Sequence, residues 1–306
     1  MGTSMRDSAR TAVEDCLDVR EGETVLVVTD SERREIGRAI HDVASDITET
    51  VYAEIGVDER HGEEPLAPVT AAMRESDVVF VPTTRSLTHT EARKEACESG
   101  ARVATLPSIT REVMEGAMRA DYYGIQERAE DLLGRLEGSE TVRIESDLGT
   151  DLRLELGERD WHPDTGICHD SGCVTNLPAG EVYIAPVSGD GRLVVDGSMS
   201  SVGVVDEPIE IEFEDGRAVG ISDDDLRETV DEAGDCGRHL AELGIGLNPE
   251  AELIGNVLQD EKALGTIHVA VGDDTGFGGD NDCGLHLDGV VTQPRVEVDG
   301  KTLELE

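Results

Sequence analysis

The spacing of apolar residues changes near residue 138, and this change constrains the fold more than any other feature of the sequence. Before it, continuous apolar runs such as residues 24–28 and 77–81 recur between stretches of helical periodicity. Such runs are typical of a parallel sheet with helices on both faces. After it, apolar and polar residues alternate at 141–145 and 151–155, which is typical of antiparallel strands with one buried face.

The chain is therefore predicted to combine an α/β part with an α+β part. Residues 1–138 are expected to form a Rossmann-like domain around a parallel sheet. Residues 139–306 are expected to form a mainly antiparallel β domain that carries a metal site. The turn after the first strand, at 29–32, lacks the glycine-rich sequence that cradles phosphates, and its acidic residues Asp30 and Glu32 would repel one. We therefore favour an architectural role for the first domain over nucleotide binding.

The charge of the chain narrows its possible partners. Among 306 residues, 68 are Asp or Glu and 26 are Lys or Arg, so the formal net charge is −42. The acidic residues are spread along a chain with periodic apolar blocks, which indicates an acidic shell suited to a high-salt cytoplasm instead of disorder. This charge disfavours nucleic acids and anionic membranes as partners. The N-terminus lacks an apolar signal core, and a cytoplasmic location is expected.

The spacing of the cysteines does not indicate a framework of disulfides. An intracellular chain of this length does not need disulfides, and most of the cysteines are expected to act as small apolar residues. The six are Cys16, Cys97, Cys168, Cys173, Cys236 and Cys283. The segment from Cys168 to Cys173 has the form of half a metal site, but the sequence offers no second half with matching spacing. We therefore interpret this segment as a loop.

The strongest chemical signal lies in the last third of the chain. His268 falls in a predicted strand, and His286 and Asp288 begin another one. Residues i and i+2 share one face of a strand, so His286 and Asp288 would project together. A lone histidine among Val and Ile is more often a core residue than a ligand. Two imidazoles and a carboxylate from adjacent strands, however, are the minimal set for a metal site.

Two glutamates could extend this set. Glu181 and Tyr183 would share one face of a strand, and Glu242 would share a face with Gly244 and Gly246. The glycines leave room for a close neighbour, such as a substrate backbone or another strand. Each glutamate also has a simpler explanation in so acidic a chain, because a solvated strand edge or a helix end would look the same.

Together these segments resemble the metallo-aminopeptidase family typified by thermophilic leucyl aminopeptidases. The resemblance lies in the order of the motifs E-V-(F/Y)-x-A-P, a later Glu, D-E-x-A before a His, and H-x-D, over about residues 176–288. It implies two divalent ions (zinc, cobalt or manganese), a metal-activated water that attacks the first peptide bond, a peptide substrate with a free N-terminus, and a homodimer. The family's ligand positions map onto Glu181, Glu242, His268, His286 and Asp288.

The chain departs from this family at two positions. Gly180 stands where the family has the first of two glutamates, and Thr275 stands where the family has a tyrosine that stabilises the oxyanion. Tyr183 is a candidate substitute for that tyrosine.

A related branch of the fold, the mononuclear iron dioxygenase acting on 2,5-dihydroxypyridine, is similar in the last third. His268, His286 and Asp288 would then form a facial triad for one Fe(II), with open positions for oxygen and substrate. The absent tyrosine favours this alternative. Glu181 and Glu242 favour two metals, since buried carboxylates without metal would be costly. The sequence alone favours the peptidase over the dioxygenase, and a non-catalytic relative with a degenerate site is a third hypothesis.

Overall fold

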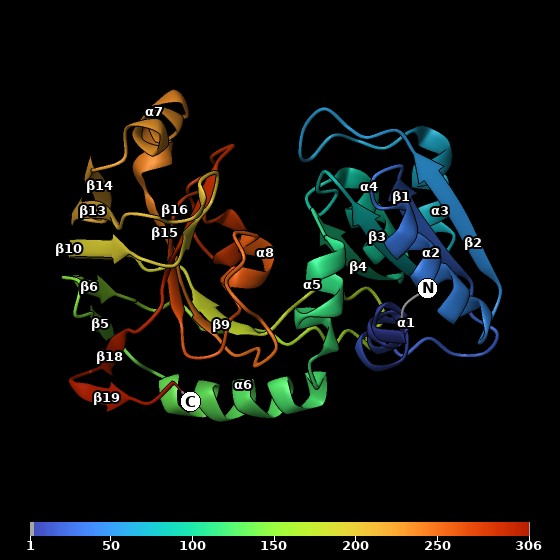
Figure 1. Cartoon of the computed structure of the whole chain (residues 1–306), viewed down its shortest axis with the longest axis horizontal. Helices are drawn as coiled ribbons and strands as arrows, with labels where there is room; N and C mark the ends of the chain where they lie inside the picture. Colours follow the sequence, from blue (N-terminus) through green and yellow to red (C-terminus); the bar gives the residue numbers. More distant parts are fainter. Residues whose placement is uncertain (1–2, 306) are drawn as a thin grey trace. The chain divides into compact units, whose positions relative to one another are not determined.

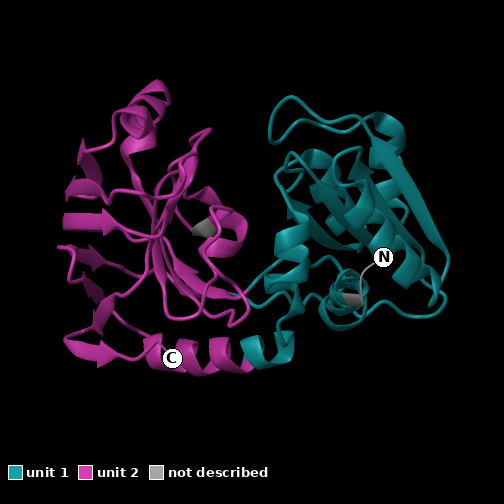
Figure 2. Cartoon of the chain, viewed as in Figure 1, with its two compact units in different colours: residues 1–126, 164–179 teal, residues 127–163, 180–306 magenta. Residues whose placement is uncertain are grey.

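The computed structural model describes residues 3–305 (Figure 1). By compactness the chain divides into two units (Figure 2), which consist of residues 1–126 with 164–179 and of residues 127–163 with 180–306. The division falls within helix α6, Tyr122–Leu136. The sequence predicted a domain boundary between residues 138 and 139, just beyond the end of this helix. The division into domains 1–138 and 139–306 stays a prediction. Among the described residues, no helix is both long and apolar enough to cross a membrane.

Unit 1 is built around a parallel five-stranded sheet in the order β2-β1-β3-β4-β8. Its strands are β1 Val25–Asp30, β2 Thr50–Ile55, β3 Val78–Thr83, β4 Arg102–Pro107 and β8 Val174–Asn176. Its helices are α1 Thr3–Arg10, α2 Arg34–Ser45, α3 Ala67–Arg74, α4 Glu91–Glu98 and α5 Arg111–Glu115, with shorter helical turns at Thr11–Cys16 and Ala117–Arg119. Strands β1 and β3 are buried along their whole length, which explains their continuous apolar sequences.

The turn after β1 is closed by a side chain. The buried Asp30 carboxylate accepts hydrogen bonds from the backbone N–H groups of Glu32 and Arg33, and from that of Thr84 after β3. These amides therefore already have an acceptor at the place where a phosphate-binding loop would offer free ones.

Unit 2 contains two seven-stranded sheets, in the orders β14-β13-β10-β6-β5-β18-β19 and β12-β11-β17-β16-β15-β9-β7. The first sheet consists of β5 Thr141–Glu145, β6 Asp151–Glu155, β10 Ser188–Val195, β13 Ile209–Glu214, β14 Arg217–Ile221, β18 Arg295–Val298 and β19 Lys301–Leu303. The second consists of β7 His162–Asp164, β9 Glu181–Ile184, β11 Ser198–Met199, β12 Gly203–Val204, β15 Leu240–Gly246, β16 Ile267–Gly272 and β17 His286–Val291. Unit 2 also contains the helices α7 Asp224–Glu232 and α8 Val257–Asp260, and the 3-10 turns η3 Asp235–Arg238 and η4 Thr275–Phe277.

Both sheets contribute to one hydrophobic core, which includes Leu152 and Leu154 of β6 together with Val182, Leu243 and Val269 of the second sheet. These positions alternate with polar residues along their strands, so the second sheet keeps a polar face opposite the core. The predicted combination of a parallel sheet with a mainly antiparallel β part is confirmed.

Two disulfides contradict the expectation for the cysteines. Cys168 pairs with Cys173, and Cys236 pairs with Cys283, each with Cα atoms 5.6 Å apart. Cys16 and Cys97 keep free thiols. The expectation that most cysteines are simple apolar residues is thus wrong for four of the six. The fold brings Cys236 to Cys283 across 47 positions, and the loop at 168–173 brings its two end cysteines together. The segment from Cys168 to Cys173 is a loop, as predicted.

Candidate metal centre

The polar face of the second sheet carries all five residues that the motifs single out. Glu181 comes from β9, Glu242 from β15, His268 from β16, and His286 and Asp288 from β17. All of them belong to unit 2. Four adjacent strands therefore bring together residues that lie up to 107 positions apart in the sequence.

The pairing register explains why these side chains share a face. Gly244 of β15 lies opposite His268 on one side and Tyr183 on the other. Ala270 of β16 lies opposite both Glu242 and Asp288. Since directly paired residues of antiparallel strands project to the same side, the side chains in these positions face one another across the strands.

Glu242 joins two groups of potential ligands. The Nε2 atom of His268 lies 3.3 Å from Glu181 Oε2 and 3.4 Å from Glu242 Oε1. The Nε2 atom of His286 lies 3.1 Å from Glu242 Oε2 and 3.2 Å from Asp288 Oδ1. The ligand atoms within each group, Glu181–Glu242–His268 and Glu242–His286–Asp288, all lie within 4.8 Å of one another. The two oxygens of Glu242 thus serve different imidazoles.

Two glycines make room for this arrangement. A Cβ atom on Gly244 would lie 2.0 Å from Cε1 of His268, and one on Gly246 would lie 2.1 Å from the carbonyl oxygen of Ala263. The close neighbours that the sequence predicted are therefore an imidazole ring and a backbone carbonyl. Glycine at 244 allows His268 to lie flat against the sheet.

Backbone carbonyls orient both imidazoles. The Nδ1 atom of His268 lies 3.1 Å from the carbonyl oxygen of Glu261, and that of His286 lies 2.7 Å from the carbonyl oxygen of Asp273. A carbonyl can only accept, so each Nδ1 carries the hydrogen and each Nε2 faces the carboxylates. This is the usual outer support of a histidine that binds a metal through Nε2.

The raised pKa values of His268 and His286 indicate that the carboxylates of the centre favour positive charge there. Burial opposes protonation, but the hydrogen bond to Glu242 and the charge of Glu181 raise the pKa of His268 to about 10. Burial also opposes protonation of His286, yet Asp288 and Glu242 raise its pKa well above the ordinary value. Without a metal, protons occupy both Nε2 positions, and a divalent ion would displace them.

The pKa values of the three carboxylates shift in different directions. Burial raises the pKa of Glu181 to about 7, although Lys262 and His268 act against this shift. Burial acts in the same direction on Glu242 and Asp288, but their imidazole partners keep the pKa of each below its usual value. Glu181 is therefore the carboxylate of the cluster that can exchange a proton near neutral pH.

The residues fit a divalent metal ion. Glu181 Oε2 is buried, lies in an ion pair with His268 at 3.3 Å and accepts no hydrogen bond from any described residue, so a metal ion would supply a partner for this oxygen. Imidazole with carboxylate is a donor set that suits zinc, iron, cobalt and manganese. The metal-binding roles of Glu181, Glu242, His268, His286 and Asp288 stay predictions.

The motifs did not reveal two supporting residues, Lys262 and Ser200. Lys262 is only 2% exposed, and its ammonium group lies 2.8 Å from Glu181 Oε1 and also contacts Glu261. Ser200 Oγ accepts the backbone N–H of Asp288 at 3.0 Å. A compositional signal for Lys262 existed, because it is one of only three lysines in the chain and follows two acidic residues. A buried lysine normally requires such partners.

Tyr183 and Thr275 lie in different surroundings. Tyr183 is half-buried on the polar face, with its ring centroid 5.6 Å from that of His162. Thr275 is exposed and donates its hydroxyl to Asp273 at 2.8 Å. A catalytic role for Tyr183 stays a prediction.

Three comparisons with known proteins bear on this centre. The family model described as NicX, 2,5-dihydroxypyridine 5,6-dioxygenase, matches residues 4–304. The 2,5-dihydroxypyridine dioxygenase from Pseudomonas putida KT2440 has a similar structure, with a TM-score of 0.82 and 18% identity over 100% of this chain and 96% of that one. Wild-type AmpT from Thermus thermophilus is also similar, with a TM-score of 0.71 and 18% identity over 99% and 97% of the two chains. A search of curated proteins gave no significant match.

At this level of identity, the solved structures show a shared fold. Together with the family, they indicate a metal-binding enzyme and leave its reaction class open.

Proposed function

The chain belongs to the NicX family of 2,5-dihydroxypyridine 5,6-dioxygenases, and from this premise we propose that it is a ring-cleaving dioxygenase with one Fe(II). The observation that carries the proposal is that His268, His286 and Asp288 share one face of the paired strands β16 and β17, in a chain that matches this family over nearly its whole length. The family match reverses the preference for a peptidase that the motifs alone support.

His268, His286 and Asp288 would hold the iron in this proposal. Fe(II) bound there would supply open coordination positions for dioxygen and for a hydroxyl group of an aromatic ring. The substrate class is a small hydroxylated nitrogen heterocycle of the dihydroxypyridine type.

Glu181 is the candidate base for this substrate. Its Oε2 atom lies 3.3 Å from His268 Nε2 and accepts no hydrogen bond from the described residues. Burial raises the pKa of Glu181 to about 7, so this oxygen can take the proton that a ring hydroxyl gives up near neutral pH. The ammonium group of Lys262 donates a hydrogen bond to Glu181 Oε1 at 2.8 Å, and this bond fixes the direction of Oε2.

A specific observation favours a second candidate, an aminopeptidase with two divalent ions. Glu242 directs Oε1 to His268 and Oε2 to His286, as expected of a carboxylate that bridges two metals. All five residues, including Glu181, would then be ligands of zinc, cobalt or manganese. Such a pair of ions would supply an activated water for attack on the first peptide bond of a peptide with a free N-terminus. The fold shared with AmpT is compatible with this activity.

Metal content per chain tests the two candidates. Protein purified in high salt without air is reconstituted with Fe(II) or Zn(II), analysed for bound metal, and assayed for oxygen uptake with 2,5-dihydroxypyridine and for hydrolysis of aminoacyl substrates. One iron with oxygen uptake supports the dioxygenase. Two ions with hydrolysis support the aminopeptidase, and a protein that binds no metal is the non-catalytic relative.

The variant Glu181→Gln separates the candidates further. In the dioxygenase it is expected to retain the iron and lose turnover, because it removes a base but no ligand. In the aminopeptidase it is expected to lose one of two ions. Glu155→Gln, on the exposed side of β6, is the matched control and should change neither property.

A further inference from the structure

The disulfide between Cys236 and Cys283 joins the two segments that lead into the metal centre. Cys236 lies in η3, directly before β15, which carries Glu242. Cys283 lies three positions before His286, the first residue of β17. The cross-link therefore ties together the approaches to two strands whose side chains meet at the centre.

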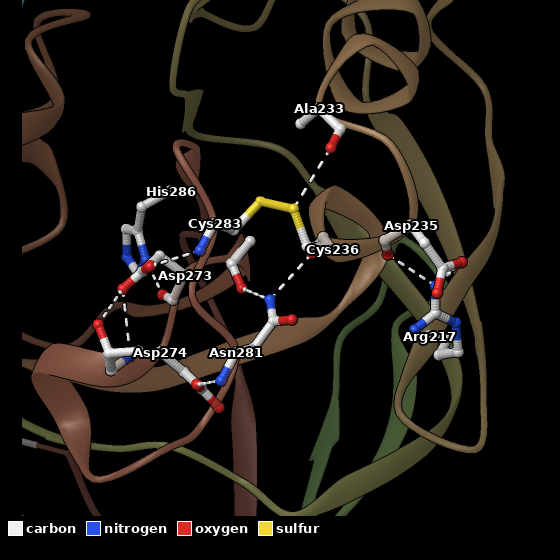
Figure 3. The surroundings of a disulfide bond; sticks show 11 residues. Arg217, Ala233, Asp235, Cys236, Asp273, Asp274, Asn281, Cys283 and His286 are labelled. Carbon is white, nitrogen blue, oxygen red and sulfur yellow. Dashed lines mark hydrogen bonds and ion pairs between the residues drawn. A yellow bond between two sulfur atoms is a disulfide. The ribbon is translucent and has the colours of Figure 1, made fainter.

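A continuous set of contacts runs from this disulfide to His286 (Figure 3). The backbone N–H of Cys283 donates to Asp273 Oδ2 at 2.7 Å, and the carbonyl oxygen of Asp273 accepts the Nδ1 hydrogen of His286 at 2.7 Å. The side-chain amide of Asn281 donates to the carbonyl oxygens of Cys236 at 3.0 Å and of Gly272 at 2.6 Å. The residue that orients His286 is thus itself held by the cross-linked segment.

The loop at 273–285 contains little regular structure and is held by individual contacts. Its regular structure is limited to the short turn η4, and it contains Gly276, Gly278, Gly279 and Gly284. The first part is held by buried Asp274, whose carboxylate lies 2.9 Å from His239 Nε2 and accepts the backbone N–H of Asn281 at 2.7 Å. The part beyond Asn281, which leads to His286, is held by Cys283 and by the carbonyl oxygen of Leu285, which accepts the backbone N–H of Asp273 at 2.6 Å. Loss of the cross-link would therefore loosen this part most.

We propose that the Cys236–Cys283 disulfide positions His286 and that its reduction weakens binding of a divalent metal to the group Glu242–His286–Asp288. Loss of support for a metal-binding histidine typically costs about 10- to 100-fold in metal affinity, and a decrease in this range is expected here. The inference rests on metal binding by His286, which both candidate functions share. Redox state would thus control how much metal the enzyme retains.

The reaction that tests this has a simple balance. A tertiary phosphine, tris(2-carboxyethyl)phosphine, donates two electrons to the S–S bond, which breaks into two thiols that take two protons from water. The phosphine becomes its oxide with the oxygen of that water. In a cell, a dithiol would be the corresponding reductant and would itself become a disulfide.

The double variant C168S/C173S provides the background for the experiment, because Cys236–Cys283 is then the disulfide left to reduce. Free thiols per chain should rise from two, Cys16 and Cys97, to four. Mn(II), which prefers oxygen and nitrogen ligands to thiolates, is the probe. Its dissociation constant is measured by electron paramagnetic resonance before and after reduction, with circular dichroism showing that the protein is folded in both states.

A rise in the Mn(II) dissociation constant of about 10-fold or more on reduction supports the inference. The variant C236S/C283S should show the same weak binding and no change on treatment with the phosphine. Equal affinity before and after reduction, with four free thiols, overturns the inference and leaves the proposed function intact. Failure of the oxidised protein to bind Mn(II), Fe(II) or Zn(II) overturns the proposed function itself. If C236S/C283S does not fold, the reduction of folded protein still decides the matter.

Discussion

Gly244→Ala tests whether His268 must lie flat against the sheet for the centre to bind metal. The added Cβ would lie 2.0 Å from Cε1 and 2.2 Å from Nε2 of His268, whereas non-bonded carbon atoms come to rest about 3.5 Å apart. The ring must therefore move by about 1.5 Å. His268 is only 1% exposed, so the ring moves against packed neighbours, at a cost of about 1–3 kcal/mol in unfolding free energy.

This shift also removes Nε2 from its contacts at 3.3 and 3.4 Å with Glu181 and Glu242. We therefore expect metal affinity to fall by at least about 10-fold, measured by titration of metal-free protein together with urea unfolding. Gly220→Ala in β14 is the matched control, because its Cβ would meet no atom closer than 3.6 Å. If Gly244→Ala binds metal like the unmodified protein, His268 is not a ligand in the proposed geometry.

Three further predictions concern the charges of the centre. In the two-metal case, Glu242→Ala should lower metal content per chain and abolish turnover, because it removes the bridging carboxylate; normal metal content in elemental analysis would contradict this. In metal-free protein the raised pKa of His268, about 10, stabilises the fold fully below pH 6.5, and this contribution disappears as the pH rises through 10. Urea unfolding between pH 7 and 10 should therefore show falling stability without metal and a smaller fall with it. Lys262→Met should lower the unfolding free energy by about 3–5 kcal/mol, because the buried Glu181 carboxylate loses its ammonium partner. Lys94→Met on the surface should lower it by under about 1 kcal/mol.

The parts of the structure that depend on local periodicity could be predicted from the sequence. The change from continuous to alternating apolar runs identified the parallel and antiparallel sheets. The i, i+2 spacing of His286 and Asp288 placed both on one face of β17, and the same rule paired Glu242 with Gly244 and Gly246.

The parts that depend on long-range contacts could not be predicted from one sequence. The approach of Cys236 to Cys283 is an example, since neither cysteine has a local signal for its partner. The contact between Lys262 and Glu181 crosses 81 positions. The motifs ranked the peptidase first because they contain five possible ligands, and motifs do not record how many ions those side chains share.

The position of Glu242 between the two imidazoles has a consequence for any titration of this centre. A first ion that engages one oxygen of Glu242 withdraws charge from the other oxygen and also fixes its direction. If both groups bind ions, we therefore expect a coupling free energy between them. The isotherm for two ions should depart from that of identical separate sites, and a substitution in one group should alter affinity in the other.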